Sequence, residues 1–178
     1  MNGILVTLIS FTINFQDRVN DVPWHYTDLR SVSITINSIN LRFAIEVDRL
    51  FQNFSGPIYI FAEADNNRST GWDNTGNISE DEFPLDGADI MIIVNHMLPE
   101  KSAIYILNSD ESYSYLNRIN CQIQRFNDTR TTITLTIQRS ILNNIFKIKL
   151  FVGEEGNLGD AMPDNGFIEV ESTLLMLD

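Results

Sequence analysis

Apolar and polar residues alternate along most of this chain, and this period of two is the feature that most constrains its fold. The pattern is clearest at residues 32–36, 41–47, 132–137 and 146–152. Because successive side chains in a β-strand point to opposite faces, each of these segments offers one apolar face to a core and one largely polar face to water. The alternation therefore predicts an all-β protein.

The same pattern, together with polar turns between its runs, predicts about ten strands along the chain. We expect them at residues 4–16, 29–37, 39–47, 57–65, 87–95, 102–108, 112–126 (read as one strand or as two), 131–137, 145–152 and 166–176. Residues 90–94 are apolar on both faces, which is typical of a central strand, and residues 138–144 are the one candidate for a short helix. We expect a single domain over residues 1–178, folded as a two-sheet antiparallel β-sandwich of the jelly-roll or immunoglobulin-like kind.

Charge and metal-ligand content narrow the possible functions. The chain has 24 Asp and Glu against 12 Lys and Arg, a formal net charge of −12, which argues against nucleic acid as a partner because phosphate binding needs a cationic face. One cysteine and two histidines give neither a disulfide nor a usual zinc site. A bound metal would be ligated by oxygen, and calcium is the first candidate.

The first 17 residues contain an apolar stretch that is too short to span a bilayer, and its alternation fits a strand better than a signal peptide. We therefore expect no membrane insertion. Four Asn-x-Ser/Thr triplets, at Asn53, Asn67, Asn77 and Asn127, are consistent with an extracellular or cell-surface location.

Oxygen-bearing side chains gather in three segments. The first, after the first strand, carries Asp17, Asp21 and Asp28; the third, residues 156–166, carries Asp160 and Asp164. The second is "FAEADNNRSTGW", residues 61–72, and extends to Asp89. In it we expect Glu63 and Asp65 to share one strand face, Asn67 to follow in the turn, and Gly71 to adopt a positive φ. The segment is either a calcium-binding loop or an Asx-rich turn without an ion. The spacing of its oxygen-bearing residues is not that of an EF-hand loop.

The order of these motifs resembles that of secreted calcium-binding β-sandwiches, namely the DOMON-like domains and the related family-nine carbohydrate-binding modules. The usual central motif is Asp-x-Asp-x-Asn-x-x-Thr-Gly followed by Gly-Ala-Asp, and the matching residues here are Asp65, Asn67, Thr70, Gly71, Gly87, Ala88 and Asp89. Glu63 replaces the first Asp of that motif. In the early loop Asp17 and Asp21 match, and Asn20 stands where the relatives have glycine.

The resemblance implies a structural calcium ion and a ligand-binding role. The expected metal ligands are Glu63, Asp65, Asn67, Thr70, Asp89, Asp17, Asp21, Asp160 and Asp164. If successive strands are antiparallel, the early and late acids meet at one pole of the sandwich, and the group from Glu63 to Asp89 lies at the opposite pole. A single miscounted strand would merge the two groups.

Three aromatic residues in polar loops, Trp24, Tyr26 and Trp72, are candidates for stacking on sugar rings, with a structural role at the ends of the sandwich as the alternative. No Ser-His-Asp set can be assembled from two histidines, so we expect a non-catalytic protein. The favoured function is a non-catalytic, extracellular calcium-binding module that binds carbohydrate or another ligand. The alternative is a subunit of a surface filament, pilus or surface layer, whose N-terminal strand completes the sheet of a neighbouring protein subunit.

Overall fold

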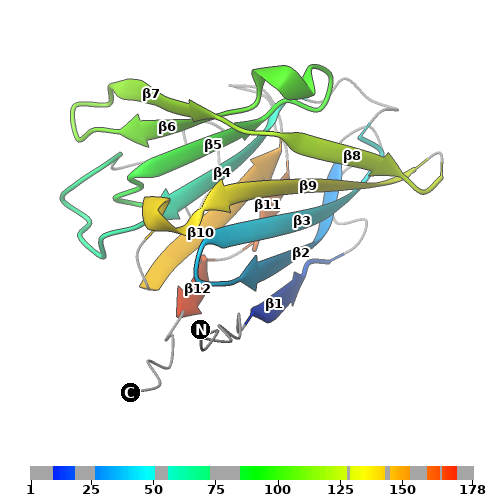
Figure 1. Cartoon of the computed structure of the whole chain (residues 1–178), viewed down its shortest axis with the longest axis horizontal. Helices are drawn as coiled ribbons and strands as arrows, with labels where there is room; N and C mark the ends of the chain where they lie inside the picture. The colour runs from blue at the N-terminus through cyan, green and yellow to red at the C-terminus, as the bar shows by residue number, and fades with distance from the viewer. Residues whose placement is uncertain are drawn as a thin grey trace, which may run out of the picture.

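The computed structural model describes residues 10–18, 27–50, 56–72, 85–127, 129–142, 145–152, 160–164 and 166–171, and it confirms a two-sheet antiparallel sandwich. The five-stranded sheet has the order β1-β2-β3-β9-β8, and the seven-stranded sheet has the order β11-β10-β4-β5-β6-β7, with β12 also paired to β10 (Figure 1). The strands are β1 (Phe11–Gln16), β2 (Asp28–Ile36), β3 (Asn40–Asp48), β4 (Ile58–Glu63), β5 (Ile90–Val94), β6 (Ala103–Leu107), β7 (Tyr113–Arg118), β8 (Cys121–Arg125), β9 (Arg130–Gln138), β10 (Ile145–Val152), β11 (Asp160–Met162) and β12 (Ile168–Glu171).

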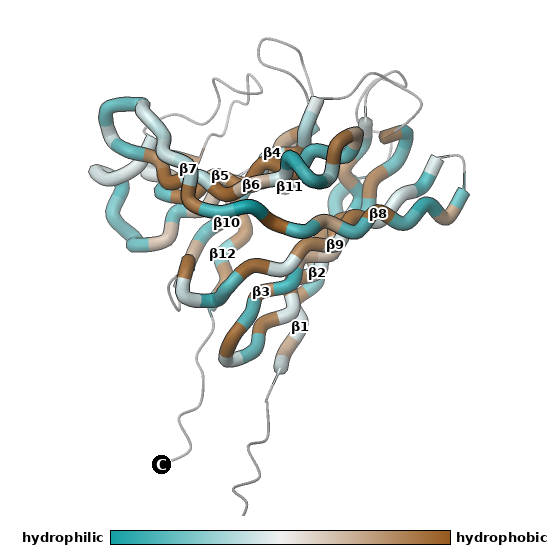
Figure 2. Tube along the Cα trace, turned by 45° about the horizontal axis from the view of Figure 1, so that its top comes forward, coloured by the Kyte–Doolittle hydropathy of each residue, from teal (hydrophilic) through white to brown (hydrophobic). Residues whose placement is uncertain are grey.

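In the five-stranded sheet, the apolar residues of the alternating sequence are buried and most of the polar residues between them are more exposed. In β3, Leu41, Phe43 and Ile45 are buried and face the other sheet, whereas Arg42 is exposed on the outer face. The neighbouring strands β2 and β9 follow the same rule, and Figure 2 shows apolar and polar positions alternating along these strands. The outer face of this sheet is consequently polar and rich in threonine.

The core lies between the two sheets and draws buried residues from both, including Phe43 and Ile45 from one and Ile60, Ile92 and Ile148 from the other. The seven-stranded sheet also buries part of its outer face, where Phe61, Met91, Phe151 and Leu107 form a second apolar cluster. Burial on both faces explains why β4 and β5 have nearly continuous apolar sequences. As predicted, β5 is an inner strand, with β4 and β6 on either side.

Several element boundaries differ from the sequence-based expectation. The segment 112–126 forms two strands, because the chain leaves the seven-stranded sheet after β7 and enters the five-stranded sheet as β8 (Figure 1). The sequence does not predict the three-residue strand β11, and the expected helix at 138–144 is a single 3-10 turn, η2 (Arg139–Ile141); a second turn, η1 (Pro99–Lys101), follows β5. No helix in the described part of the chain has the length and apolar character needed to cross a membrane.

Candidate metal centre

Three carboxylates that are far apart in the sequence meet at one edge of the sandwich. Asp17 directly follows β1, Asp160 is the first residue of β11, and Asp164 lies just beyond that strand. One carboxylate oxygen from each lies within 4.8 Å of the others, and we call these three residues the acidic triad. Because β1 belongs to the five-stranded sheet and β11 to the seven-stranded sheet, the acidic triad spans both sheets.

Backbone contacts fix two members of the acidic triad. Asp160 is 3% exposed; its Oδ2 accepts a hydrogen bond from the Leu29 N–H and its Oδ1 accepts one from the Ala161 N–H at 2.9 Å. The Asp17 N–H donates to the Arg30 carbonyl at 2.9 Å, which continues the pairing of β1 with β2 past the end of the strand. The sheets therefore hold the carboxylate of Asp160 and the backbone of Asp17.

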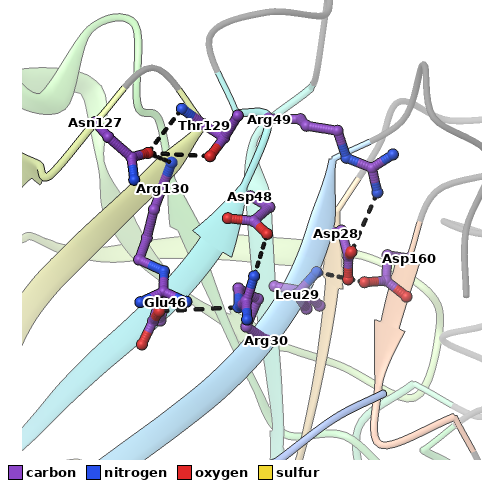
Figure 3. A network of polar contacts seen from close by, with 10 residues as sticks. All are labelled: Asp28, Leu29, Arg30, Glu46, Asp48, Arg49, Asn127, Thr129, Arg130 and Asp160. Atoms are coloured by element: carbon purple, nitrogen blue, oxygen red, sulfur yellow. Dashed lines mark hydrogen bonds and ion pairs between the residues drawn. The ribbon is translucent and has the colours of Figure 1, made fainter. Parts of the chain in front are cut away.

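Neighbouring acids in this region have cationic partners. Figure 3 shows Asp28, buried beside Asp160, in an ion pair with Arg49 at 3.1 Å. Further along the same face, Arg30 pairs with Asp48, and Glu46 lies 2.7 Å from Nε of Arg130. Asp28 is thus engaged by a guanidinium and is not grouped with the triad, although it comes from the same segment as Asp17 and Asp21. Asp21, a predicted ligand, lies outside the described residues.

The second predicted group of ligands forms a loop that is closed by its own hydrogen bonds. Asp65 Oδ1 accepts from the Asn67 N–H at 2.8 Å, and Asp65 Oδ2 accepts from the Thr70 hydroxyl at 2.9 Å. Asn67 Oδ1 accepts from both the N–H and the hydroxyl of Ser69, at 3.2 and 2.7 Å. This arrangement is an Asx turn, which is the alternative that the sequence leaves open for this loop.

Asp89 lies at the base of the same loop. Its Oδ2 accepts hydrogen bonds from the N–H groups of Ala64 and Asp65, at 2.8 and 3.2 Å. Burial raises the pKa of this carboxyl above its ordinary value of 3.8; the Ala64 hydrogen bond opposes that rise, and the charge of Asp65 adds to it. Asp65, Thr70 and Asp89 together line one end of an open pocket of about 480 Å³.

Two glycines let the loop approach the start of β5. Gly71 has φ = 68°, as predicted, and a Cβ on it would lie 2.0 Å from the Ala88 carbonyl oxygen. Gly87 has φ = 72°, and a Cβ there would lie 2.6 Å from the Cα of Arg68. The approach is held by a backbone bridge between Trp72 and Ala88.

Glu63 departs from the expected geometry. It is the last residue of β4 and is 2% exposed, whereas Asp65 lies past the end of the strand and is exposed, so the two do not share a face. The reason is that the chain turns directly after β4, with Asn66 at φ = 59°. Lys147 of β10 lies opposite Glu63, and its Nζ is 2.6 Å from Glu63 Oε2 and 3.0 Å from Asn66 Oδ1. A carboxylate in contact with an ammonium group is poorly placed to ligate a cation.

The two groups of acids lie at opposite ends of β10. Glu63 is opposite Lys147 near the start of that strand, and Asp160 is opposite Val152 at its end. Five residues of strand separate these positions, or about 17 Å at a rise of about 3.3 Å per residue. The separation agrees with the prediction made from strand directions, and the loop at 65–70 does not share a site with Asp160 and Asp164.

Of the three aromatic residues predicted to bind sugar, the structure describes only Trp72. Trp72 is half-buried; its ring packs against Phe61 and Tyr113, with centroids 6.2 and 6.4 Å away, and its Nε1 donates to the Ser112 carbonyl at 3.3 Å. These contacts favour the structural role for Trp72. Trp24 and Tyr26 lie outside the described residues.

Comparison with protein-family models, with curated proteins and with solved structures gives no match for this chain. The resemblance to DOMON-like domains and family-nine carbohydrate-binding modules therefore stays a hypothesis. The class that the fold defines is an all-β sandwich of two antiparallel sheets, and any function has to be argued from its own residues.

Proposed function

We propose that this protein is a non-catalytic β-sandwich module that binds one calcium ion at the acidic triad and uses the ion to join its two sheets. The observation that carries the proposal is the convergence of Asp17, Asp160 and Asp164 from both sheets, with one oxygen of each within 4.8 Å of the others. Of the nine predicted ligands, the proposed site keeps the three whose carboxylates converge from different segments of the chain.

The oxygen ligands of the triad are compatible with calcium. The three oxygens lie within 4.8 Å of one another, close enough to bind one ion at calcium–oxygen distances of about 2.3–2.6 Å. Calcium takes six to eight oxygen ligands in a flexible geometry, whereas magnesium demands a nearly ideal octahedron. Three carboxylates supply the charged part of such a shell, and backbone carbonyls or water would complete it. Three carboxylates this close repel each other, and a bound cation would relieve that repulsion where β11 packs against β2.

Calcium binding would therefore act on stability. An ion that binds only the folded chain stabilises it by mass action, by about 2.7 kcal/mol at one hundred times the dissociation constant. For a chain of this size that corresponds to a rise in melting temperature of roughly 5–10 °C. We expect this rise when calcium is added to chelator-treated protein, and we expect sodium chloride or magnesium chloride at matched ionic strength to give a smaller one.

Matched variants test the location of the ion. Asp164→Asn should abolish most of the calcium-dependent rise in melting temperature, and Asp65→Asn, which removes the same charge at the other pole, should leave it intact. Isothermal titration calorimetry should give one site for the wild type. If Asp65→Asn removes the effect and Asp164→Asn does not, the ion belongs to the loop at 65–70. Equal melting temperatures with calcium and with chelator would exclude a stabilising calcium site altogether.

One observation favours the second candidate, a filament or surface-layer subunit. Among the strands that the structure describes, β1 is an edge strand that pairs only with β2, so its other side can offer backbone groups to another chain. In that case size-exclusion chromatography and electron microscopy would show assemblies that a variant lacking residues 1–16 cannot form. A monomer under all conditions would eliminate this candidate and leave the module.

A further inference from the structure

An open pocket of about 540 Å³ lies where the chain crosses from one sheet to the other. Its polar lining comes from the end of β7, the connection to β8, and the outer faces of β8, β9 and β3: Arg118, Asn120, Gln122, Thr134, Thr136 and Arg42. Figure 1 shows the chain crossing from β7 to β8. Within this crossing the side chain of Ile119 is buried, and its N–H donates to the Ser102 carbonyl at 3.1 Å. The volume is within the range of small-molecule sites.

The two arginines of this pocket have exposed side chains, and neither guanidinium makes an ion pair or hydrogen bond with any residue that the structure describes. For Arg42 the cause is visible in the register, since its cross-strand neighbours are Thr35 on β2 and Thr136 on β9, both neutral. Two uncompensated positive charges thus share one pocket in a chain whose net charge is −12.

Other arginines on the same sheet are used differently. Arg30 and Arg130 both contact Glu46, at 3.8 and 2.7 Å, and Arg49 pairs with Asp28. Acids are therefore available to this sheet, but they lie toward its other end, on residues 46 and 48 of β3. This distribution of charge favours an anion over a cation in the pocket.

The remaining side chains define the rest of the ligand. Two amides and two threonine hydroxyls can each donate and accept hydrogen bonds, which suits a ligand with several hydroxyl groups. Of the described residues that line the pocket, none is acidic and none is aromatic. A nucleotide or another flat aromatic ligand would find no ring to stack on, so the complementary ligand is hydrophilic throughout.

We propose that the pocket formed by Arg42, Arg118, Asn120, Gln122, Thr134 and Thr136 binds an acidic saccharide, with the arginines holding a uronic-acid carboxylate and the amides and hydroxyls binding the ring hydroxyls. A guanidinium presents a planar fork of donors that matches a carboxylate with two parallel hydrogen bonds. The saccharide site goes beyond the proposed calcium site and lies in a different place from Trp72.

The pocket is independent of the proposed calcium ion. Strands β1 and β8 are the two opposite edges of the five-stranded sheet; the acidic triad lies at the β1 edge and the pocket toward the β8 edge. Binding can therefore be measured in the presence of a chelator, which also prevents calcium from bridging an acidic sugar to the protein. Failure of the calcium proposal would leave this result unaffected, and the reverse also holds.

The test is a titration of the full chain, in chelator and at low salt, with digalacturonic acid as the probe and with its neutral galactose disaccharide as the control. Amide chemical shifts measured by NMR spectroscopy should move at residues 118–122 and 134–136 with the acidic probe only. The affinity should fall as salt is added, because the arginines are exposed to solvent and their charge is screened.

Variants with one charge removed complete the test. Arg42→Gln and Arg118→Gln should each weaken binding by about tenfold, the size expected for loss of a hydrogen bond to a charged group. Arg68→Gln removes the same charge from an exposed arginine that does not line this pocket, and it should leave the affinity unchanged. Arg42→Lys should recover only part of the affinity, because an ammonium group keeps the charge but lacks the fork.

The other outcomes would overturn the proposal. They are no shift with the acidic disaccharide at millimolar concentration, equal binding of the neutral disaccharide, or binding that both Gln variants retain. If inorganic phosphate competes as well as the acidic sugar, the pocket is a general anion site. If Arg42→Gln instead abolishes self-association, the pocket receives an acidic segment of a second copy of the chain.

Discussion

At the scale of single residues, Glu63 and Lys147 form a buried ion pair beneath the loop at 65–72. Their side chains are 2% and 14% exposed, and the ammonium of Lys147 also lies 5.2 Å from the ring centroid of Phe167. Glu63 Oε1 has no hydrogen-bond partner among the residues that the structure describes. Lys147 is therefore the principal compensation for the charge of this carboxylate.

Removing only the cation should be strongly destabilising. We expect Lys147→Met to lower the free energy of unfolding by about 3–5 kcal/mol, because it leaves an uncompensated charge in the interior. The double variant Glu63→Gln with Lys147→Met should recover a large part of the loss, since no buried charge then remains. Urea denaturation followed by circular dichroism measures both. A loss below about 1 kcal/mol in the single variant would mean that water solvates Glu63.

Asp89 gives a prediction about pH. Because burial and the Asp65 charge raise its pKa in the folded state, the folded chain holds this proton more tightly than the unfolded chain does. The contribution of Asp89 to the free energy of unfolding is therefore greatest below pH 3.8, the ordinary pKa that applies to the unfolded chain. It is lost as the pH rises from 3.8 through the higher pKa of the folded state. Asp65→Asn should move the Asp89 pKa toward its ordinary value, as measured by carboxyl NMR titration in chelator.

Asp110 is the internal control for that titration. Hydrogen bonds from the hydroxyl and N–H of Ser112 lower the pKa of Asp110, in the opposite direction to that of Asp89. Asp110 does not interact with Asp65, so Asp65→Asn should leave its titration unchanged. If the Asp89 pKa does not respond either, burial alone accounts for its rise.

At the scale of elements, the loop at 65–72 packs closely against the start of β5, and this close approach fixes the position of the loop. We expect Gly71→Ala to lower the free energy of unfolding by about 2–4 kcal/mol, because the added Cβ clashes with the Ala88 carbonyl and the positive φ is strained. Gly166→Ala is the matched control: it has φ = 74° but no atom within 4 Å of its Cβ, so only about 1 kcal/mol of backbone strain applies. Thermal and urea denaturation of the two variants separate clash from strain. Equal losses would show that the loop moves aside.

The elements that the sequence predicts well are those with long, regular alternation. The predicted bounds of strands β2, β3, β9 and β10 fall within one residue of the observed ones. For β2, β3 and β9 the reason is that each strand buries one face, so a slip of one residue would expose it. The strand β11 has only three residues, Asp160 to Met162, and is too short to show any period. The sequence does not predict where the chain breaks between β7 and β8. Both strands are exposed along much of their length, so their apolar and polar residues alternate only weakly.

Residues of a candidate site can be predicted to meet only where the direction of the strands alone places them at the same end of the sandwich. Antiparallel order predicts that Asp17 meets Asp160 and Asp164, since the end of one strand and the start of another fall at one pole. The partner of Glu63 is not predictable, because Lys147 reaches it only through the pairing of β10 with β4. Likewise, Arg42 and Arg118 carry no shared motif, and the order β3-β9-β8 is what brings them to one pocket.

At the scale of the whole molecule, the net charge of −12 sets a background of repulsion. Screening should relieve it, so we expect the melting temperature to rise modestly between low salt and about 0.15 M sodium chloride, where the Debye length is about 8 Å. The ion pairs around Glu46 oppose this trend, but they involve few of the 24 acids. Differential scanning calorimetry at several salt concentrations measures the balance. A melting temperature that falls with salt would show that the ion pairs dominate.

The order of strands in the five-stranded sheet has a consequence for synthesis on the ribosome. Strand β3 lies between β2 and β9, and its pairing with β9 runs from Asn40↔Gln138 to Asp48↔Arg130. Four strands of the other sheet are translated in between, which takes several seconds at roughly 5–20 residues per second. Throughout that interval the β2–β3 hairpin has an open edge next to the apolar residues Phe43, Ile45 and Val47. We therefore expect the nascent chain to expose this edge to other chains or to chaperones until β9 emerges.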